Sequence, residues 1–246
     1  MKREVYRQTL RTLSDWDSFL LKESGLPGPR ANLELMQAVA DEGTRELFQR
    51  YLVFTPDRAS TNSPEVFLVI CGVVGLGRVL AEGDRDQLAV LHELANDPRW
   101  RVREAVAMAL QRWGDVDMAA LVKAMQDWIK GSLLERRAAI AGVCEPRLLR
   151  DPKQAKQVLK LLDKVTTSVV RATDRKADNF KTLRQALAYC WSVAVVALPA
   201  DGKIAMEKWF VHPDADTRWI MRENLKKNRL VKMDATWVQK NLKRLA

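Results

Sequence analysis

Four arginines recur in matching contexts along the chain, each before a short run of small or apolar residues, and they are Arg103, Arg136, Arg184 and Arg222. They are separated by 33, 48 and 38 residues, and Arg137 directly follows the second of them. A guanidinium group is always charged and donates paired hydrogen bonds, which suits phosphate oxygens. We therefore expect these five arginines to bind nucleic acid.

Three tryptophans lie close in sequence to three of these arginines, and they are Trp100, Trp191 and Trp219. Aromatic rings stack on exposed bases or sugars, and basic grooves that hold nucleic acid commonly combine the two kinds of side chain. The sequence thus predicts that these three rings contact the ligand. Trp113 and Trp128 fit better as core or edge residues.

The clearest element that carries such residues is the segment 97–115. Asp97-Pro98 is a helix-entry signal, the apolar positions from Val102 to Leu110 recur at helical spacing, and Trp113 extends their stripe. Gly114-Asp115 is expected to end the helix. The apolar face is small and aliphatic, so a neighbouring helix can approach it closely.

The rest of the chain shows the same helical periodicity and no sustained strand-like alternation, so the fold class is all-α. The segment Glu65–Ala81 is apolar nearly all round and should be an inner helix, with glycines that permit close packing. Residues 171–179 form a charged insertion after a helix opened by Asp151-Pro152. The other expected helices cover residues 2–24 (one or two), 32–40, 44–52, 84–95, 116–129, 133–144, 180–198, 204–210, 217–228 and 233–245.

The order Asp-Pro, Val-Arg, alanines, Leu and Gly-Asp in residues 97–115 resembles the second helix of a HEAT repeat. This resemblance implies a right-handed α-solenoid of HEAT-like helix pairs. Residues 1–82 would be a divergent helical cap, continuous with repeats over 83–246 in a single domain. Second helices usually line the concave face, which would place the four arginines in one groove. The alternative is that each arginine pairs with an acidic residue of a neighbouring repeat and braces the stack.

A second pattern is similar to the HEAT-like alkylpurine DNA glycosylases. Trp100 and Glu104 have the spacing of a tryptophan and a carboxylate in that family, and Arg136-Arg137 and Trp191 follow in similar contexts. The resemblance implies that Glu104 would stabilise an oxocarbenium-like sugar, with an arginine on phosphate and both rings around the lesion. The family has Asp where this chain has Glu104, and an aromatic residue where it has Leu134. We therefore expect binding rather than catalysis.

Charge and composition restrict the partners. The formal net charge of +10 favours a nucleic acid or an acidic protein surface, and of the nucleic acids DNA is expected rather than RNA. The three cysteines lie far apart in apolar contexts, which predicts buried thiols in a cytoplasmic protein. Two histidines without metal-ligand spacing give no metal site, and no cofactor is expected. The N-terminal residues lack the apolar core of a signal peptide, and no run is long enough for a membrane span.

The sequence leaves three functions open. The first is a HEAT-like binding module whose basic concave groove holds a nucleic-acid backbone. The second is a glycosylase-like enzyme of alkylation repair that uses Glu104, and the third is a scaffold for protein–protein interactions. The spacing of the arginines favours the first.

Overall fold

The computed structural model describes residues 2–245, and every regular element in that range is a helix. Contacts divide the chain into two compact units, residues 1–116 (unit 1) and residues 117–246 (unit 2). The all-α prediction is confirmed. The predicted boundary at residue 82 falls inside unit 1, within the turn that follows α5.

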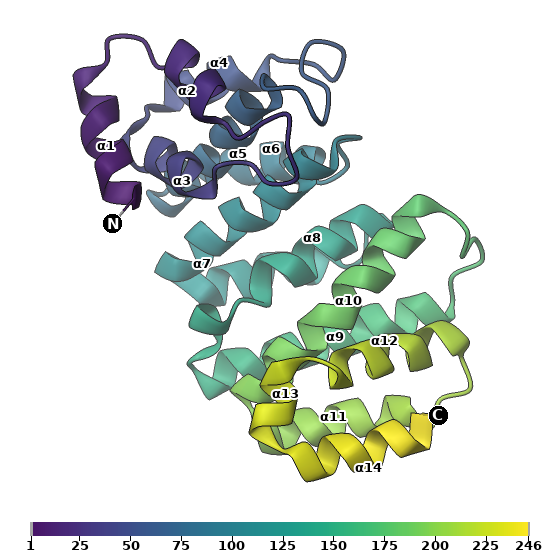
Figure 1. Cartoon of the computed structure of the whole chain (residues 1–246). Coiled ribbons are helices and arrows are strands. Elements are labelled where there is room, and N and C mark those ends of the chain that lie inside the picture. Colours follow the sequence, from purple (N-terminus) through teal and green to yellow (C-terminus); the bar gives the residue numbers. More distant parts are fainter. Residues whose placement is uncertain (1, 246) are drawn as a thin grey trace. The chain divides into compact units, whose positions relative to one another are not determined.

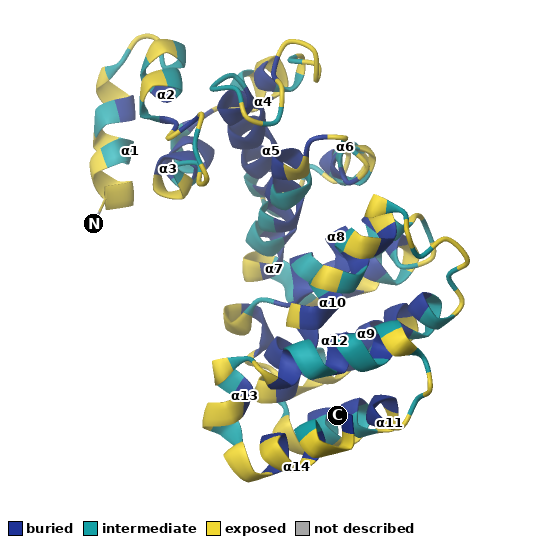
Figure 2. Cartoon of the chain, turned by 45° about the vertical axis from the view of Figure 1, so that its right-hand side comes forward, coloured by how far each residue is buried: buried dark blue, intermediate teal, exposed yellow. Residues whose placement is uncertain are grey.

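Unit 1 is built around α5 (Val66–Ala81), which is buried along almost its whole length (Figure 2). The predicted inner helix is confirmed. The surrounding helices are α1 (Lys2–Thr12), α2 (Asp17–Glu23), α3 (Leu33–Glu42), α4 (Arg45–Leu52), α6 (Gln87–Leu94) and the first part of α7, which begins at Trp100. Side-chain caps begin two of them, since Asn32 accepts the Leu35 amide and Thr44 accepts the Leu47 amide.

Two glycines on α5 allow its neighbours to come close. A Cβ on Gly75 would lie 2.4 Å from the Phe48 ring of α4, and a Cβ on Gly77 would lie 2.4 Å from the Ala109 carbonyl oxygen of α7. Both distances are far below van der Waals contact, so only glycine fits at these positions without a shift of backbone or ring. The predicted role of these glycines in close packing is confirmed.

The helix that begins at Trp100 does not end at Gly114-Asp115, as the sequence analysis expected. α7 (Trp100–Trp128) continues to Asp117, where the backbone leaves the helical region at φ −144° and ψ 82°. The Asp117 carboxylate then accepts the Ala120 amide at 2.8 Å and so caps the second part. Gly114 is buried within the helix, and the division between the units falls at the Asp117 break.

Unit 2 contains two rows of packed helices (Figure 1). α8 (Leu133–Val143), α10 (Asp178–Ala197) and α12 (Ala215–Leu225) lie side by side, with α10 against both others. α9 (Pro152–Val170) and α11 (Pro199–Phe210) pack against each other and against α10 and α12. A 3-10 turn (Pro146–Leu149), α13 (Asn228–Met233) and α14 (Ala235–Leu245) complete the unit.

Side-chain caps begin several helices of unit 2, and the one at Asp151 was predicted from the sequence. Ser132 and Glu135 form a reciprocal capping box at the start of α8, and Asp151 accepts the Lys153 amide at the start of α9. The beginning of α11 was predicted five residues too late, at Ile204. Proline is well tolerated in the first turn of a helix, and Pro199 begins this one.

Candidate functional site

The two units differ sharply in charge. Unit 1 has 15 Lys and Arg against 17 Asp and Glu, a formal net charge of −2, whereas unit 2 has 26 against 14, a net charge of +12. The whole positive excess of the chain therefore belongs to unit 2. A search for a polyanion site starts there.

Two of the recurring arginines of unit 2 brace neighbouring helices. Arg184 of α10 contacts the Asp216 carboxylate of α12, and its guanidinium lies 4.3 Å from the centre of the Trp219 ring. Arg222 of α12 donates a hydrogen bond to the Leu245 carbonyl at the end of α14. Arg184 pairs with an acidic residue of a neighbouring helix, as in the bracing alternative, whereas Arg222 joins two helices through a backbone carbonyl.

Arg103 of unit 1 also makes intramolecular contacts. Its guanidinium donates to the backbone carbonyls of Asp97 at 2.6 Å and Pro98 at 2.8 Å, just before α7. These bonds hold the turn that leads into the helix. Both hydrogen bonds come from the Nη1 atom of the guanidinium.

Arg136 of α8 differs from these three. Its side chain has no hydrogen bond or ion pair with any residue in the range 2–245, and its Nε, like that of Arg184, is buried without an acceptor. It lines a hollow of about 630 Å³ together with Lys164 of α9 and Arg171, which follows the last residue of α9. A buried donor without a partner is energetically costly, so this guanidinium is poised to receive an acceptor from outside the chain.

The rest of the hollow is polar and only weakly acidic. Its walls include Thr173 from the connection between α9 and α10 and Asn179 from the first turn of α10, and Asp174 is the single carboxylate that lines it among residues 2–245. Asp174 already accepts the backbone amides of Lys176 and Ala177, both at 3.1 Å. Three cations therefore face one carboxylate that is engaged locally, and the hollow can accept an anion such as a phosphate group.

The structure does not support the predicted ligand contact of Trp191. Its ring is 0% exposed, and its Nε1 donates to the Thr166 hydroxyl at 3.0 Å. Trp191 is therefore a core residue, and the sequence analysis mistook helical core spacing for a stacking position. Arg137 is also buried and makes contacts within the protein.

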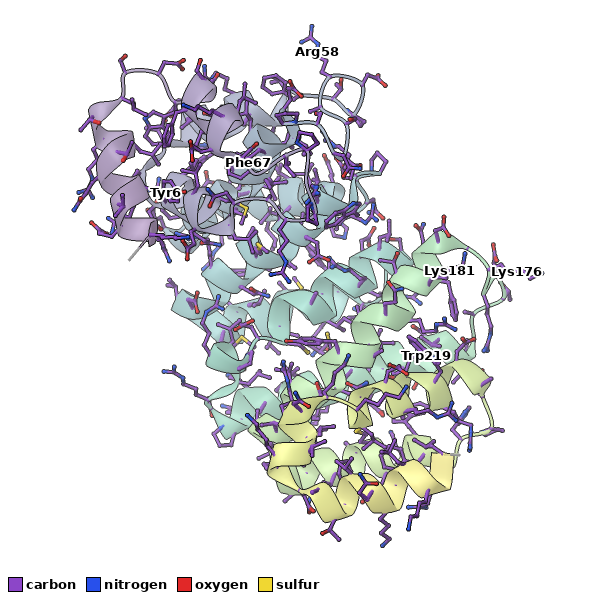
Figure 3. The ribbon with its side chains drawn as sticks, viewed as in Figure 1. Tyr6, Arg58, Phe67, Lys176, Lys181 and Trp219 are labelled. Atoms are coloured by element: carbon purple, nitrogen blue, oxygen red, sulfur yellow. The ribbon has the colours of Figure 1, made fainter. Side chains whose placement is uncertain are left out.

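Trp219 is neither fully buried nor fully exposed. Its side chain lies on α12, labelled in Figure 3, and is partly exposed beneath the Arg184 guanidinium. The predicted core residues Trp113 and Trp128 are buried, which confirms their assignment.

Trp100 and Glu104 line a second hollow, in unit 1. They lie on successive turns of α7, and the cavity of about 310 Å³ has walls of mainly apolar side chains such as Leu33 and Met36 of α3. Trp100 is 45% exposed, so its ring is accessible to a ligand. The spacing of four residues thus brings these two side chains to one cavity, as expected for one face of a helix.

Arg101 holds the loops beside this cavity. It donates to the Thr61 carbonyl at 2.9 Å and to the Gly28 carbonyl at 2.7 Å, and its guanidinium lies 4.4 Å from the centre of the Trp100 ring. Burial lowers the pKa of this guanidinium below its ordinary value. Arg101 is thus a structural residue that fixes one wall of the cavity.

Sequence reasoning overlooked the cations of α9. Lys156, Lys160 and Lys164 follow one another at intervals of four residues, and Arg171 follows seven residues after the last. That spacing puts them along one face of the helix, and it was visible in the sequence.

The remaining chemistry is limited. The three thiols are unpaired and buried, as predicted, and burial raises the pKa of Cys71. In the described range, 2–245, no group of three or more His, Cys, Asp or Glu side chains could hold a metal ion. Over those same residues, each helix is too short or too polar to cross a bilayer.

Comparison with known proteins gives no family for this chain. No protein-family model matches it, and no curated protein is significantly similar to it. The resemblance to HEAT repeats therefore stands on the residues quoted above.

Proposed function

We propose that this chain is a HEAT-like repeat protein of the cytoplasm whose second unit binds the sugar-phosphate backbone of nucleic acid, DNA in preference to RNA. The proposal includes a right-handed α-solenoid formed by helix pairs. The two rows of helices in unit 2 support it, since α8, α10 and α12 each carry one of the recurring arginines and lie side by side. The buried thiols fit a reducing compartment.

One observation carries the binding function. Arg136 has a buried, unpaired Nε and shares a hollow with Lys164 and Arg171, in a unit with a net charge of +12. Phosphate oxygens would accept hydrogen bonds from the guanidinium and balance the local charge. The braced arginines, Arg184 and Arg222, would shape the surface rather than contact the ligand.

The test is the affinity of the full chain for a labelled DNA duplex at several salt concentrations. We expect Arg136→Ala to weaken binding about tenfold at low salt and to reduce the slope of log K against log[salt] by about one. Arg58→Ala is the matched control, because Arg58 is exposed on a loop of unit 1 and points away from the helices (Figure 3). Binding that is absent, or insensitive to salt, would refute the proposal.

A second candidate function follows from the cavity of unit 1. Trp100 and Glu104 line one apolar cavity of about 310 Å³, which is large enough for a single base. This supports glycosylase-like chemistry, with Trp100 against a base and Glu104 as the carboxylate that stabilises a cationic sugar. Release of an alkylated base from DNA, abolished by Glu104→Gln with the fold intact, would establish the enzyme. Absence of release with the unaltered chain would remove it.

A further inference from the structure

A third hollow, of about 430 Å³, lies in the valley between α9 and α11. Its floor is apolar, and Leu159 of α9 and Ile204 and Ala205 of α11 contribute to it. Ile204 is 73% exposed, an unusual position for a large aliphatic side chain beside a buried leucine. The valley is thus an apolar surface that unit 2 leaves open.

Lysines flank this floor on both sides. Lys156, Lys160 and Lys164 come from α9, and Lys208 comes from α11. Lys156 pairs with Asp201 at 2.9 Å and Lys208 pairs with Asp163, whereas the Lys160 side chain has no ion pair or hydrogen bond within residues 2–245. The flanks keep a net positive charge after the two pairs are formed.

We propose that this valley docks an acidic amphipathic helix of a protein partner. The residues of each wall recur at three- and four-residue intervals, so the valley is a groove between two helical ridges, into which a third helix packs. From Lys156 to Lys164 it follows α9 for roughly 12 Å, about two helical turns. Leucines of the partner at positions i, i+3 or i+4, and i+7 would cover Leu159 and Ile204, and carboxylates beside them would face Lys160 and Lys164.

The same residues argue against nucleic acid in this valley. Two carboxylates, Asp163 and Asp201, lie in it and would repel phosphates. Among the described residues, 2–245, no aromatic side chain lines it, so a base would find no ring to stack on. The Trp209 ring nearby is buried and donates its Nε1 hydrogen to Asp163 at 3.0 Å. The docking proposal does not rest on the nucleic-acid function proposed above, although Lys164 lines both this valley and the hollow at Arg136.

The experiment measures binding of a labelled, end-blocked peptide of about 16 residues to the full chain by fluorescence anisotropy. The peptide carries leucines on one helical face and glutamates on its flanks. A second peptide of equal composition has the leucines spread around the helix. We expect the amphipathic peptide to bind at least about tenfold more tightly, because only its leucines can fill the valley together.

Two pairs of variants locate the site. Ile204→Glu should weaken binding of the amphipathic peptide about tenfold or more, since it puts a negative charge on the apolar floor. The matched control, Val53→Glu, changes a residue that is 63% exposed in unit 1 and should have no effect. Lys160→Glu should weaken binding several-fold, while Lys240→Glu on α14 should not. Circular dichroism checks that each variant folds.

Three results would overturn the docking site: no saturable binding of the amphipathic peptide, equal affinity for the two peptides, or an affinity that Ile204→Glu leaves unchanged. Displacement of the bound peptide by an oligonucleotide would also overturn it if the Arg136→Ala chain shows the same displacement, and would assign the valley to polyanions, because Lys164 lines both hollows. Oligonucleotide binding should instead respond to Arg136→Ala and not to Ile204→Glu. Peptide binding without any oligonucleotide binding would refute the proposed function and leave the docking site standing.

Discussion

The two units use their cations in opposite ways. In unit 1 most arginines have a partner in the same unit, either a carboxylate or a backbone carbonyl. In unit 2 several cations, among them Arg136, Lys160 and Arg171, have no such partner within residues 2–245. The numbers of charged residues explain the difference, because 17 carboxylates can match the 15 cations of unit 1, whereas 14 cannot match the 26 of unit 2.

The end of α3 shows how unit 1 uses arginine as a structural element. The Asp41 carboxylate accepts hydrogen bonds from Nε and Nη2 of Arg3, both at 2.7 Å. It also accepts one from Nη2 of Arg112 on α7 at 2.6 Å. The adjacent Glu42 accepts Arg7 at 2.6 Å and Arg11 at 2.7 Å, both from α1. Two neighbouring carboxylates thus hold α1 and α7 to α3, and these arginines are not available to a ligand.

The largest effect that we predict concerns the packing of unit 1. Gly77→Val would place side-chain atoms on the Ala109 backbone of α7, which cannot move without displacing that helix. We expect a loss of about 3 kcal/mol in the free energy of unfolding, measured by urea denaturation. Ala89→Val on the exposed face of α6 is the matched control and should cost well under that. Equal stability of both variants would show that α5 and α7 are not closely packed.

Charge reversal tests the contrast between the units directly. The double variant Arg136→Glu and Arg171→Glu should weaken binding of a DNA duplex by about 100-fold at low salt, since each change replaces an attraction to phosphate with a repulsion. The matched double variant in unit 1, Arg58→Glu and Lys22→Glu, alters the net charge equally at two exposed positions. Equal losses in the two double variants would mean that overall charge, and not the hollow at Arg136, determines affinity.

A smaller effect tests the assignment of Trp191 to the core. Trp191→Phe removes the hydrogen bond to Thr166 and leaves a small cavity, so the free energy of unfolding should fall by about 2 kcal/mol. DNA affinity should not change under conditions where the variant is folded. Trp100→Phe, at an exposed ring, should leave stability nearly unaltered. Weaker DNA binding by Trp191→Phe at full stability would contradict the assignment.

The smallest effect that we predict is the change in melting temperature with pH. Hydrogen bonds from Arg11 lower the pKa of Glu42 below its ordinary value of 4.5, burial opposes this, and the bond from Arg7 lowers it further. A lowered folded-state pKa adds stability that is complete above about pH 4.5 and is lost as the pH falls through the lowered pKa. Glu42→Gln should therefore reduce the melting temperature slightly at pH 6, with a difference that shrinks towards pH 3.

The exposed Glu34 of the same helix supplies the control for this measurement. Glu34→Gln should leave the melting temperature nearly unchanged at both pH values, because its carboxylate has no ion pair or hydrogen bond within residues 2–245. A difference between Glu42→Gln and the unaltered chain that grows in acid would contradict the predicted sign.

Much of the fold could be predicted from the sequence because helix signals are local. Asn32, Thr44, Ser132 and Asp151 each cap a helix through a backbone amide two or three residues away, so the segment contains all that is needed. The end of the helix at Gly114 was predicted wrongly for a related reason. Glycine only lowers helix propensity, and burial of Gly114 within unit 1 outweighs that cost.

The candidate sites were only half predictable. The spacing of Trp100 and Glu104 placed them correctly at one cavity, because residues four apart share a helix face. The contacts of the arginines could not be predicted in this way. Arg184 and Arg136 occur in similar local contexts, but the first pairs with Asp216, which is 32 residues away in sequence, and the second forms no ion pair within the described range, 2–245.

The sequence by itself determined the helical class, most helix ends, the buried character of α5 and the charge of the chain. The tertiary structure decided which arginines brace helices, that Trp191 belongs to the core, and that the lysines of α9 flank two open hollows. The physical reason is the range of the interactions. Caps and periodicity act within a few residues, whereas ion pairing and burial depend on neighbours that only packing brings together.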